Sequence, residues 1–319
     1  MHRACRRDFL KISAAVGLSG LGALSFARLA AAAGSRRKFT LDLRCGAIGV
    51  GADLRKSIEY AHQFGFESVE PPGAVAGLAQ AELDEVLAEM KARNLVWGAA
   101  GLAVDFRGDE AKFQAGMKSF PQEAAGLRKA GITRMGTWLS PSSNERTYVA
   151  NFRQHARRLR EVCKVLGDHG LRFGMEYVGP KTSWTKGRYP FIHTMAETKD
   201  LIAEIGTGNA GFVLDSWHWY TAGESVQDLL SLKGSDVVAC DLNDAPAGIP
   251  VDEQMDNSRE LPAATGVIDL EGFLGAMITI GYDGPVRAEP FNQPLNRMDD
   301  LDALKATAAA MRKAFAMVQ

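Results

Sequence analysis

Four short, mainly apolar segments in the second half of the sequence each end in an acidic residue. This pattern is typical of a buried strand whose last side chain is polar. Burying several carboxylates together is costly unless each meets a counter-charge. A divalent cation would satisfy all of them at once, whereas the alternative is that each acid caps a helix or pairs with a nearby arginine. The four acids are Glu176, Asp215, Asp241 and Glu289.

An aromatic segment follows Asp215 and contains His218 three residues later. The histidine could pack in the core. Beside a metal-binding acid it could instead donate to a substrate hydroxyl or act as a further ligand. Trp217 offers an apolar face to a sugar ring and would serve equally well as a core residue. We therefore keep His218 and Trp217 as candidates for substrate contact.

Two long polar segments, 178–192 and 244–265, follow predicted strands and carry cationic side chains. Lys186, in the first segment, could reach a substrate or lie on a solvated loop. Arg259, in the second, could bind sugar hydroxyls or a carboxylate through its planar guanidinium; the alternative is a surface ion pair with Glu260 or Asp256. Both cations join the substrate-binding candidates.

Eight apolar segments alternate with eight helical segments after residue 38. Eight strand–helix units in about 280 residues predict a (β/α)8 barrel, in which the carboxyl ends of all strands share one face. A doubly wound open sheet is the alternative, weakened because no Gly-x-Gly-x-x-Gly follows a strand. The predicted strands cover residues 39–44, 67–70, 96–100, 133–137, 172–177, 211–215, 237–243 and 286–289.

The N-terminal segment resembles a twin-arginine export signal. Arg6 and Arg7 precede a moderately apolar stretch, and Ala31 to Ala33 supply the small residues that a signal peptidase needs. The stretch is too short and too weakly apolar for a transmembrane helix; the alternative is a basic N-terminus before a buried helix. We expect residues 1–33 to be a signal peptide, residues 34–319 to be a single domain, and the mature protein to be periplasmic.

Composition excludes several classes. The apolar fraction of 46% and charged fraction of 24% are those of a globular protein. The formal net charge is −1, so the sequence has no excess of basic residues, which argues against a nucleic-acid partner. Four widely spaced cysteines without a Cys-x-x-Cys pair exclude a zinc ribbon.

From residue 173 to residue 292 the sequence resembles the xylose isomerase-like TIM-barrel superfamily of sugar isomerases and epimerases. That superfamily has a Glu ending strand five, Asp-x-x-His after strand six and a Glu ending strand eight. Glu176, Asp215 with His218, and Glu289 match this pattern. The segment that begins at Arg259 resembles the Arg-x-Leu-Pro-Gly-x-Gly loop of the family. The resemblance covers most of the chain after residue 34 and implies a TIM barrel.

Three positions depart from the family pattern. Ala263 and Thr265 differ from the loop motif, and Asp241 stands where the ketose-epimerase branch usually has a metal-binding His. An all-oxygen donor set favours Mn²⁺ or Mg²⁺ over Zn²⁺, with Co²⁺ or Zn²⁺ as further candidates. The endonuclease relatives on this barrel need more histidines than the six present.

The resemblance implies proton transfer next to a carbonyl through an enediolate. Glu176 and Glu289 would be the catalytic pair, one removing and the other returning a proton, while the metal stabilises the negative charge. A lyase or hydratase acting on an oxidised sugar would use the same enolate step. A non-catalytic periplasmic sugar-binding protein is the alternative from another class. The expected partners are a small sugar and the twin-arginine machinery, with homo-oligomer formation left open.

Overall fold

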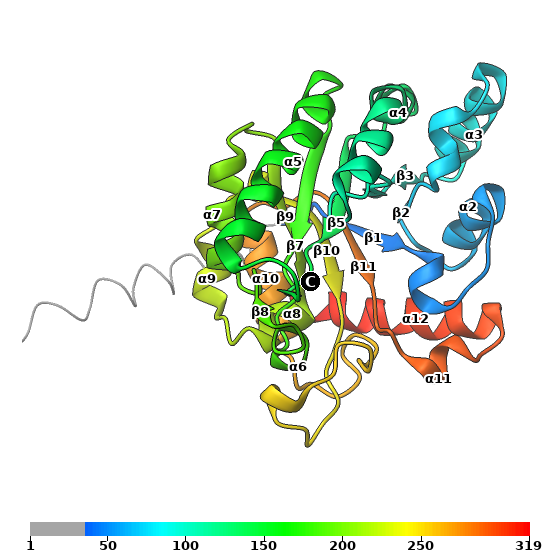
Figure 1. Ribbon diagram of the computed structural model, residues 1–319. Coiled ribbons are helices and arrows are strands. Elements are labelled where there is room, and N and C mark those ends of the chain that lie inside the picture. The colour runs from blue at the N-terminus through cyan, green and yellow to red at the C-terminus, as the bar shows by residue number, and fades with distance from the viewer. Residues whose placement is uncertain (1–35) are drawn as a thin grey trace, which may run out of the picture.

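The computed structural model describes residues 36–319, so the predicted export signal with Arg6, Arg7 and Ala33 lies outside the described residues. A parallel sheet runs in the order β3-β2-β1-β11-β10-β9-β7-β5-β4. Its two end strands are separated only by Gly98 and Ala99, so the sheet closes on itself. The helices lie outside this ring (Figure 1). The predicted (β/α)8 barrel is confirmed, and the open doubly wound sheet is wrong.

The strands agree closely with the predicted segments. The sheet contains β1 (Thr40–Leu43), β2 (Ser68–Val69), β3 (Val96–Trp97), β4 (Ala100–Gly101), β5 (Arg134–Trp138), β7 (Arg172–Glu176), β9 (Ala210–Asp215), β10 (Val237–Leu242) and β11 (Pro285–Ala288). A separate antiparallel pair joins β6 (Ser142–Ser143) to β8 (Tyr189–Pro190).

The third predicted strand is divided into β3 and β4 at Gly98, where the chain lies close to a neighbouring side chain. A Cβ atom added there would lie 2.5 Å from Oδ1 of Asp42 on β1, so only glycine fits without displacing the aspartate. The barrel interior is tight elsewhere too. A Cβ at Gly136 or Gly174 would lie 2.8 Å from a methyl group of Val213.

The helices form where the sequence supplies amphipathic spacing and caps. The side chain of Asp53 accepts from the backbone N–H of Lys56 at the start of α2, and Asp109 does the same for Lys112 in α4. The longer helices are α2 (Leu54–Gln63), α3 (Gln80–Ala92), α4 (Glu110–Lys129), α5 (Tyr148–Asp168), α7 (Met195–Ile205), α10 (Leu270–Thr279) and α12 (Asp300–Phe315).

Shorter helices lie mainly in the segments that follow strands. They are α6 (Lys181–Trp184), α8 (Ser216–Thr221), α9 (Val226–Leu230) and α11 (Gln293–Asn296). The sequence analysis did not predict α8, which begins directly after β9 because the Asp215 carboxylate accepts from the Trp217 N–H at 2.7 Å. In the described part of the chain, no helix has the length and apolar character needed to cross a membrane.

Strand register brings polar residues together inside the barrel. Asp215 on β9 is the register partner of Asp241 on β10, and Asp241 is that of Arg287 on β11. Arg287 is in turn level with Asp42 on β1. Register partners on neighbouring parallel strands point to the same face of the sheet. These four side chains therefore enter the same layer of the barrel interior.

Candidate active site

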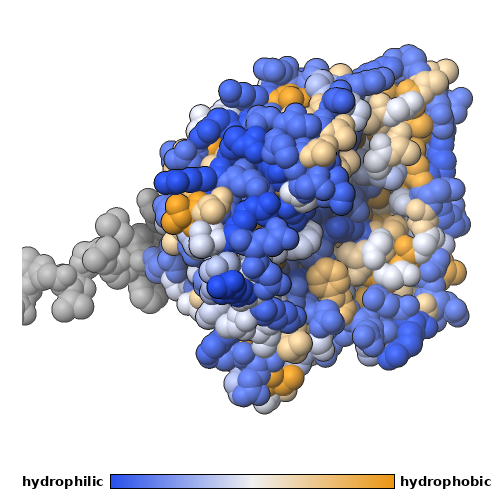
Figure 2. Space-filling view, in the orientation of Figure 1, coloured by the Kyte–Doolittle hydropathy of each residue, from blue (hydrophilic) through white to orange (hydrophobic). Residues whose placement is uncertain are grey.

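A cavity of about 480 Å³ lies at the carboxyl ends of the strands. Both long segments predicted to contact substrate contribute to it, together with the loops after β5, β9 and β11. The hydropathy surface in Figure 2 is mainly hydrophilic and has a hollow near its middle. The residues lining the cavity are Trp138, Ser140, Pro141, Ser142, Glu176, Val178, Ser183, Lys186, His218, Asp256, Arg259, Glu289 and Phe291.

The four predicted acids form two overlapping groups. Ligand atoms of Glu176, Asp241 and Glu289 lie within 4.8 Å of one another, and so do those of Glu176, Asp215 and His218. Glu176 and Glu289 line the cavity. Asp215 and Asp241 are fully buried and do not line it.

Arginines already pair with both of the acids that do not line the cavity. Nη1 of Arg259 donates to Oδ2 of Asp215 at 2.6 Å. Arg287 binds Asp241 through both carboxylate oxygens, at 2.5 and 3.1 Å. Pairing with arginine was the alternative to a metal in the sequence analysis. This pairing is present for Asp215 and Asp241. It does not exclude the binding of a further cation beside Glu176.

Glu289 is held from three directions. Its Oε1 accepts from Arg44, and its Oε2 lies 3.5 Å from Nη1 of Arg259. Its backbone N–H donates to Oδ1 of Asn243 at 3.1 Å. Arg44 also pairs with Glu70 at 3.1 Å. The sequence analysis missed Arg44 and Glu70. Each is the last residue of a predicted strand and directly follows an observed one, so the pattern that revealed the four acids applied to them as well.

Glu176 is the acid without a guanidinium partner. Its Oε1 is buried and has no hydrogen-bond partner among the described residues. Burial, and then the neighbouring Glu289, raise the pKa of Glu176 well above its usual range. Glu176 is the residue that both groups share, and its unsatisfied carboxylate oxygen fits a divalent cation.

His218 is buried and neutral. Burial, followed by the charge of Arg259, lowers its pKa to about 3. The Gly179 N–H donates to Nδ1 at 3.2 Å, so Nε2 carries the ring proton. Nη2 of Arg259 lies 3.2 Å from Nε2, which is therefore a contact between two donors. Both would be satisfied by an oxygen that accepts from them in the cavity.

The other two substrate-binding candidates are placed differently. Lys186 lines the cavity. Trp217 is fully buried and does not line it. Its ring lies 5.5 Å from the guanidinium carbon of Arg259. We therefore revise its assignment from substrate contact to packing support for Arg259, because its position at the start of α8 turns the ring into the core.

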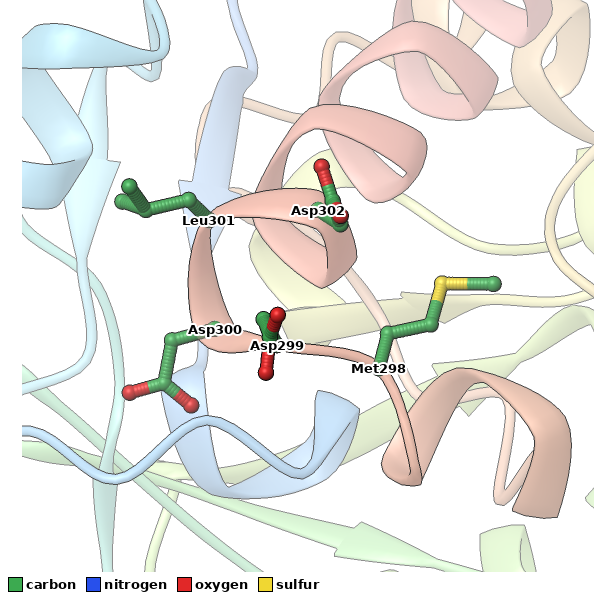
Figure 3. Close-up of a pocket in the computed structure, with 5 residues that line it drawn as sticks. All are labelled: Met298, Asp299, Asp300, Leu301 and Asp302. Carbon is green, nitrogen blue, oxygen red and sulfur yellow. The ribbon is translucent and has the colours of Figure 1, made fainter.

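A second hollow, of about 520 Å³, lies at the start of α12 and is lined by Met298, Asp299, Asp300, Leu301 and Asp302. Figure 3 shows that all five side chains come from one stretch of chain. Aspartates in a first helical turn stabilise the helix dipole, and that role accounts for them. We do not assign a site there.

Asp42 provides a test of charge burial inside the barrel. Neither of its oxygens has a hydrogen bond of acceptable geometry in the described residues, although Ser68 lies beside it. Burial raises its pKa from 3.8 to about 7. The folded state therefore holds a proton that the unfolded chain releases, and this carboxyl's contribution to stability falls as the pH rises from about 4 to 7.

Asp42→Asn removes this titration. The variant should lose less free energy of unfolding than the parent between pH 4 and pH 7, by up to a few kcal/mol. Urea unfolding at several pH values measures the effect, with the exposed Asp84→Asn as the control. Equal pH slopes for the parent and Asp42→Asn would show that Asp42 is ionised in the folded protein.

Comparison with known proteins identifies the family. Residues 58–314 match the Xylose isomerase-like TIM barrel family, and the chain belongs to it. A Xylose isomerase domain protein from Alicyclobacillus acidocaldarius subsp. acidocaldarius has a similar structure: the TM-score is 0.77 with 29% identity, covering 88% of this chain and 99% of that one. The IOLI protein with a bound zinc atom gives a TM-score of 0.73 with 17% identity, covering 88% of this chain and 99% of that one.

Two curated relatives carry named activities. An inosose isomerase from Bacillus velezensis is 25% identical over 165 residues, which are 50% of this chain and 55% of the relative. A 3-dehydroshikimate dehydratase from Pseudomonas aeruginosa is 30% identical over 135 residues, which are 42% of this chain and 20% of the relative. The chain thus spans about half the length of the first relative and a fifth of the second.

Proposed function

We propose that this protein is a sugar isomerase or epimerase that moves a proton at a carbon next to a carbonyl. The observation that carries the proposal is that Glu176 and Glu289 line one cavity at the carboxyl ends of the strands, in a chain of the Xylose isomerase-like TIM barrel family. The similarity to an inosose isomerase supports the same reaction type.

The two glutamates have different surroundings, which suits different tasks. Burial raises the pKa of Glu289, but the charges of Arg259 and Arg44 partly offset the rise and favour its carboxylate form, as a proton-removing base requires. Glu176 has no guanidinium partner and a raised pKa, so without a cation it can hold a proton near neutral pH and return it to the substrate, whereas a bound cation would keep it ionised. His218 and Arg259 direct N–H groups toward the cavity, where they would donate to substrate oxygens and stabilise the negative charge that builds up there.

A divalent cation would be held by Glu176, Asp215, Asp241 and Glu289, which fall into two overlapping groups that share Glu176. When bound, it would polarise the substrate carbonyl and stabilise the enediolate charge. We favour Mn²⁺ or Mg²⁺ because the acids supply oxygen donors. The zinc atom in the IOLI structure keeps Zn²⁺ among the candidates.

A dehydratase or lyase using the same enolate step is the second candidate, favoured by the similarity to a 3-dehydroshikimate dehydratase. Incubation in deuterated water with keto-sugars, inosose and 3-dehydroshikimate separates these functions. Deuterium in a recovered or isomerised sugar supports the isomerase or epimerase. Loss of water from a substrate supports the dehydratase, and no exchange into any bound sugar supports a non-catalytic binding protein.

Metal binding has its own test. Asp215→Asn should lower the metal content measured by elemental analysis from about one ion per chain to well below that, because a carboxylate ligand becomes a weaker neutral one. Asp283→Asn, an exposed aspartate at the opposite end of the barrel from the cavity, is the control. An unchanged metal content in Asp215→Asn would rule out this ligand set.

We also propose export by the twin-arginine route and cleavage near Ala33, from the sequence features of residues 1–33. Replacing Arg6 and Arg7 with lysine should leave the precursor in the cytoplasm. Fractionation followed by N-terminal sequencing measures this. Periplasmic, processed protein from the lysine variant would contradict the proposed route.

A further inference from the structure

Two aromatic side chains at the cavity are more exposed than aromatic residues usually are. Trp138 is 49% exposed and Phe291 is 39% exposed, and both line the cavity. The other four tryptophans are buried or half-buried. Trp138 ends β5, and Phe291 lies two residues after Glu289, so the aromatics approach the catalytic region from different strands.

Each ring is supported by a guanidinium group. The Arg107 guanidinium carbon lies 4.2 Å from the centroid of Trp138 and 4.2 Å from that of Phe106, and Arg107 also donates to Thr137 at 2.9 Å. Arg259 lies 4.6 Å from the Phe291 centroid. Cation–π contacts of this kind restrain exposed rings. Trp138 and Phe291 are therefore pre-positioned although solvent reaches them.

The backbone at Phe291 gives an independent indication. Its φ is 40°, in the left-handed region that bulky residues rarely adopt. Such a conformation costs on the order of 1–3 kcal/mol and is typically kept where function requires it. Glycine would remove this cost, so the phenyl ring at this position has a use that offsets the strain.

The surroundings of the rings have the chemistry of a carbohydrate site. Ser140, Ser142 and Ser183 line the same cavity and offer hydroxyls that both donate and accept. Aromatic faces pack against the C–H faces of a pyranose, and hydroxyls bind its rim. The volume of about 480 Å³ is within the range of roughly 300–1,000 Å³ of sites for drug-sized ligands, which are larger than a single hexose.

We propose that Trp138 and Phe291 form a second sugar-ring subsite beside the catalytic acids. The substrate class is then a neutral glycoside with two linked rings, of which one lies at Glu176 and Glu289 and the other lies against the aromatics. This inference rests on the proposed function, because it assumes that the first ring is the one that reacts.

Binding selectivity tests the subsite separately from catalysis. Calorimetric titrations of the full mature protein would compare glucose with maltose, cellobiose and trehalose. We expect at least one disaccharide to bind about tenfold more tightly than glucose. Trp138→Ala and Phe291→Gly should each remove most of that preference while changing glucose affinity little. Trp184→Phe, outside the cavity lining, is the matched control, and thermal unfolding checks that each variant is folded.

Equal affinity for glucose and all disaccharides, no binding of any of these sugars, or a preference that survives in both folded aromatic variants would overturn the subsite. Failure of the proposed function looks different. In that case no sugar of either size acquires deuterium, whatever its affinity. A protein that exchanges deuterium into monosaccharides but shows no disaccharide preference would keep the function and lose the subsite.

Discussion

Replacing either Glu289 or Glu176 with glutamine should lower turnover of the true substrate by a factor of about 100 or more. An amide has nearly the shape of the carboxyl but neither accepts nor returns a proton near neutral pH. Steady-state kinetics measures the loss, and solvent deuterium exchange shows which step remains. The exposed Glu85→Gln, on α3, is the matched control and should keep full activity.

The two glutamine variants should also differ from each other. If Glu289 removes the proton, Glu289→Gln stops exchange altogether. Glu176→Gln can still exchange solvent deuterium onto one face of the substrate carbon without completing the reaction. Near-normal turnover by both variants would contradict the two-carboxylate mechanism. A loss confined to one variant would indicate a single base that serves both faces.

Asp241→Asn should lower the free energy of unfolding by about 3–5 kcal/mol, because it leaves the buried Arg287 without its bidentate partner. Urea denaturation in the presence of a chelator measures this loss without a contribution from metal. Arg134 and Asp283 form a pair of the same residue types at 2.7 Å, with the aspartate 60% exposed. Asp283→Asn should therefore cost only about 0–1 kcal/mol.

The double variant Asp241→Asn with Arg287→Met separates two costs: the loss of the ion pair, and the burial of a charged guanidinium that has no partner. Removing the unpaired guanidinium should recover much of the stability lost in Asp241→Asn, since an apolar side chain carries no desolvation penalty. If Asp241→Asn is no less stable than Asp283→Asn, then Arg287 finds another partner, for which Glu70 at 3.8 Å is the nearest candidate.

The barrel and the acids at its strand ends could be predicted from local patterns. Alternating apolar and amphipathic segments specify strand–helix units. Eight such units in a chain of this length predict a sheet that closes into a barrel. In such a barrel the last residue of each strand must face the same end. Glu176 and Glu289 could therefore be assigned to one site without coordinates. The strand bounds differ from the predictions by only a few residues for the same reason.

The counter-charges could not be assigned in this way, because pairing depends on which side chains meet across the interior. For Arg259 the sequence analysis offered substrate contact or a surface ion pair with Glu260 or Asp256. In the structure its side chain is buried and contacts Asp256 and Asp215 together. Arg44 and Glu289 are 245 residues apart in sequence and meet only because β1 and β11 are neighbours in the closed sheet. The sequence analysis kept Trp217 as a candidate for sugar contact and did not single out Trp138. Burial separates them, since the turn of α8 directs Trp217 into the core whereas Trp138 ends β5 at the cavity.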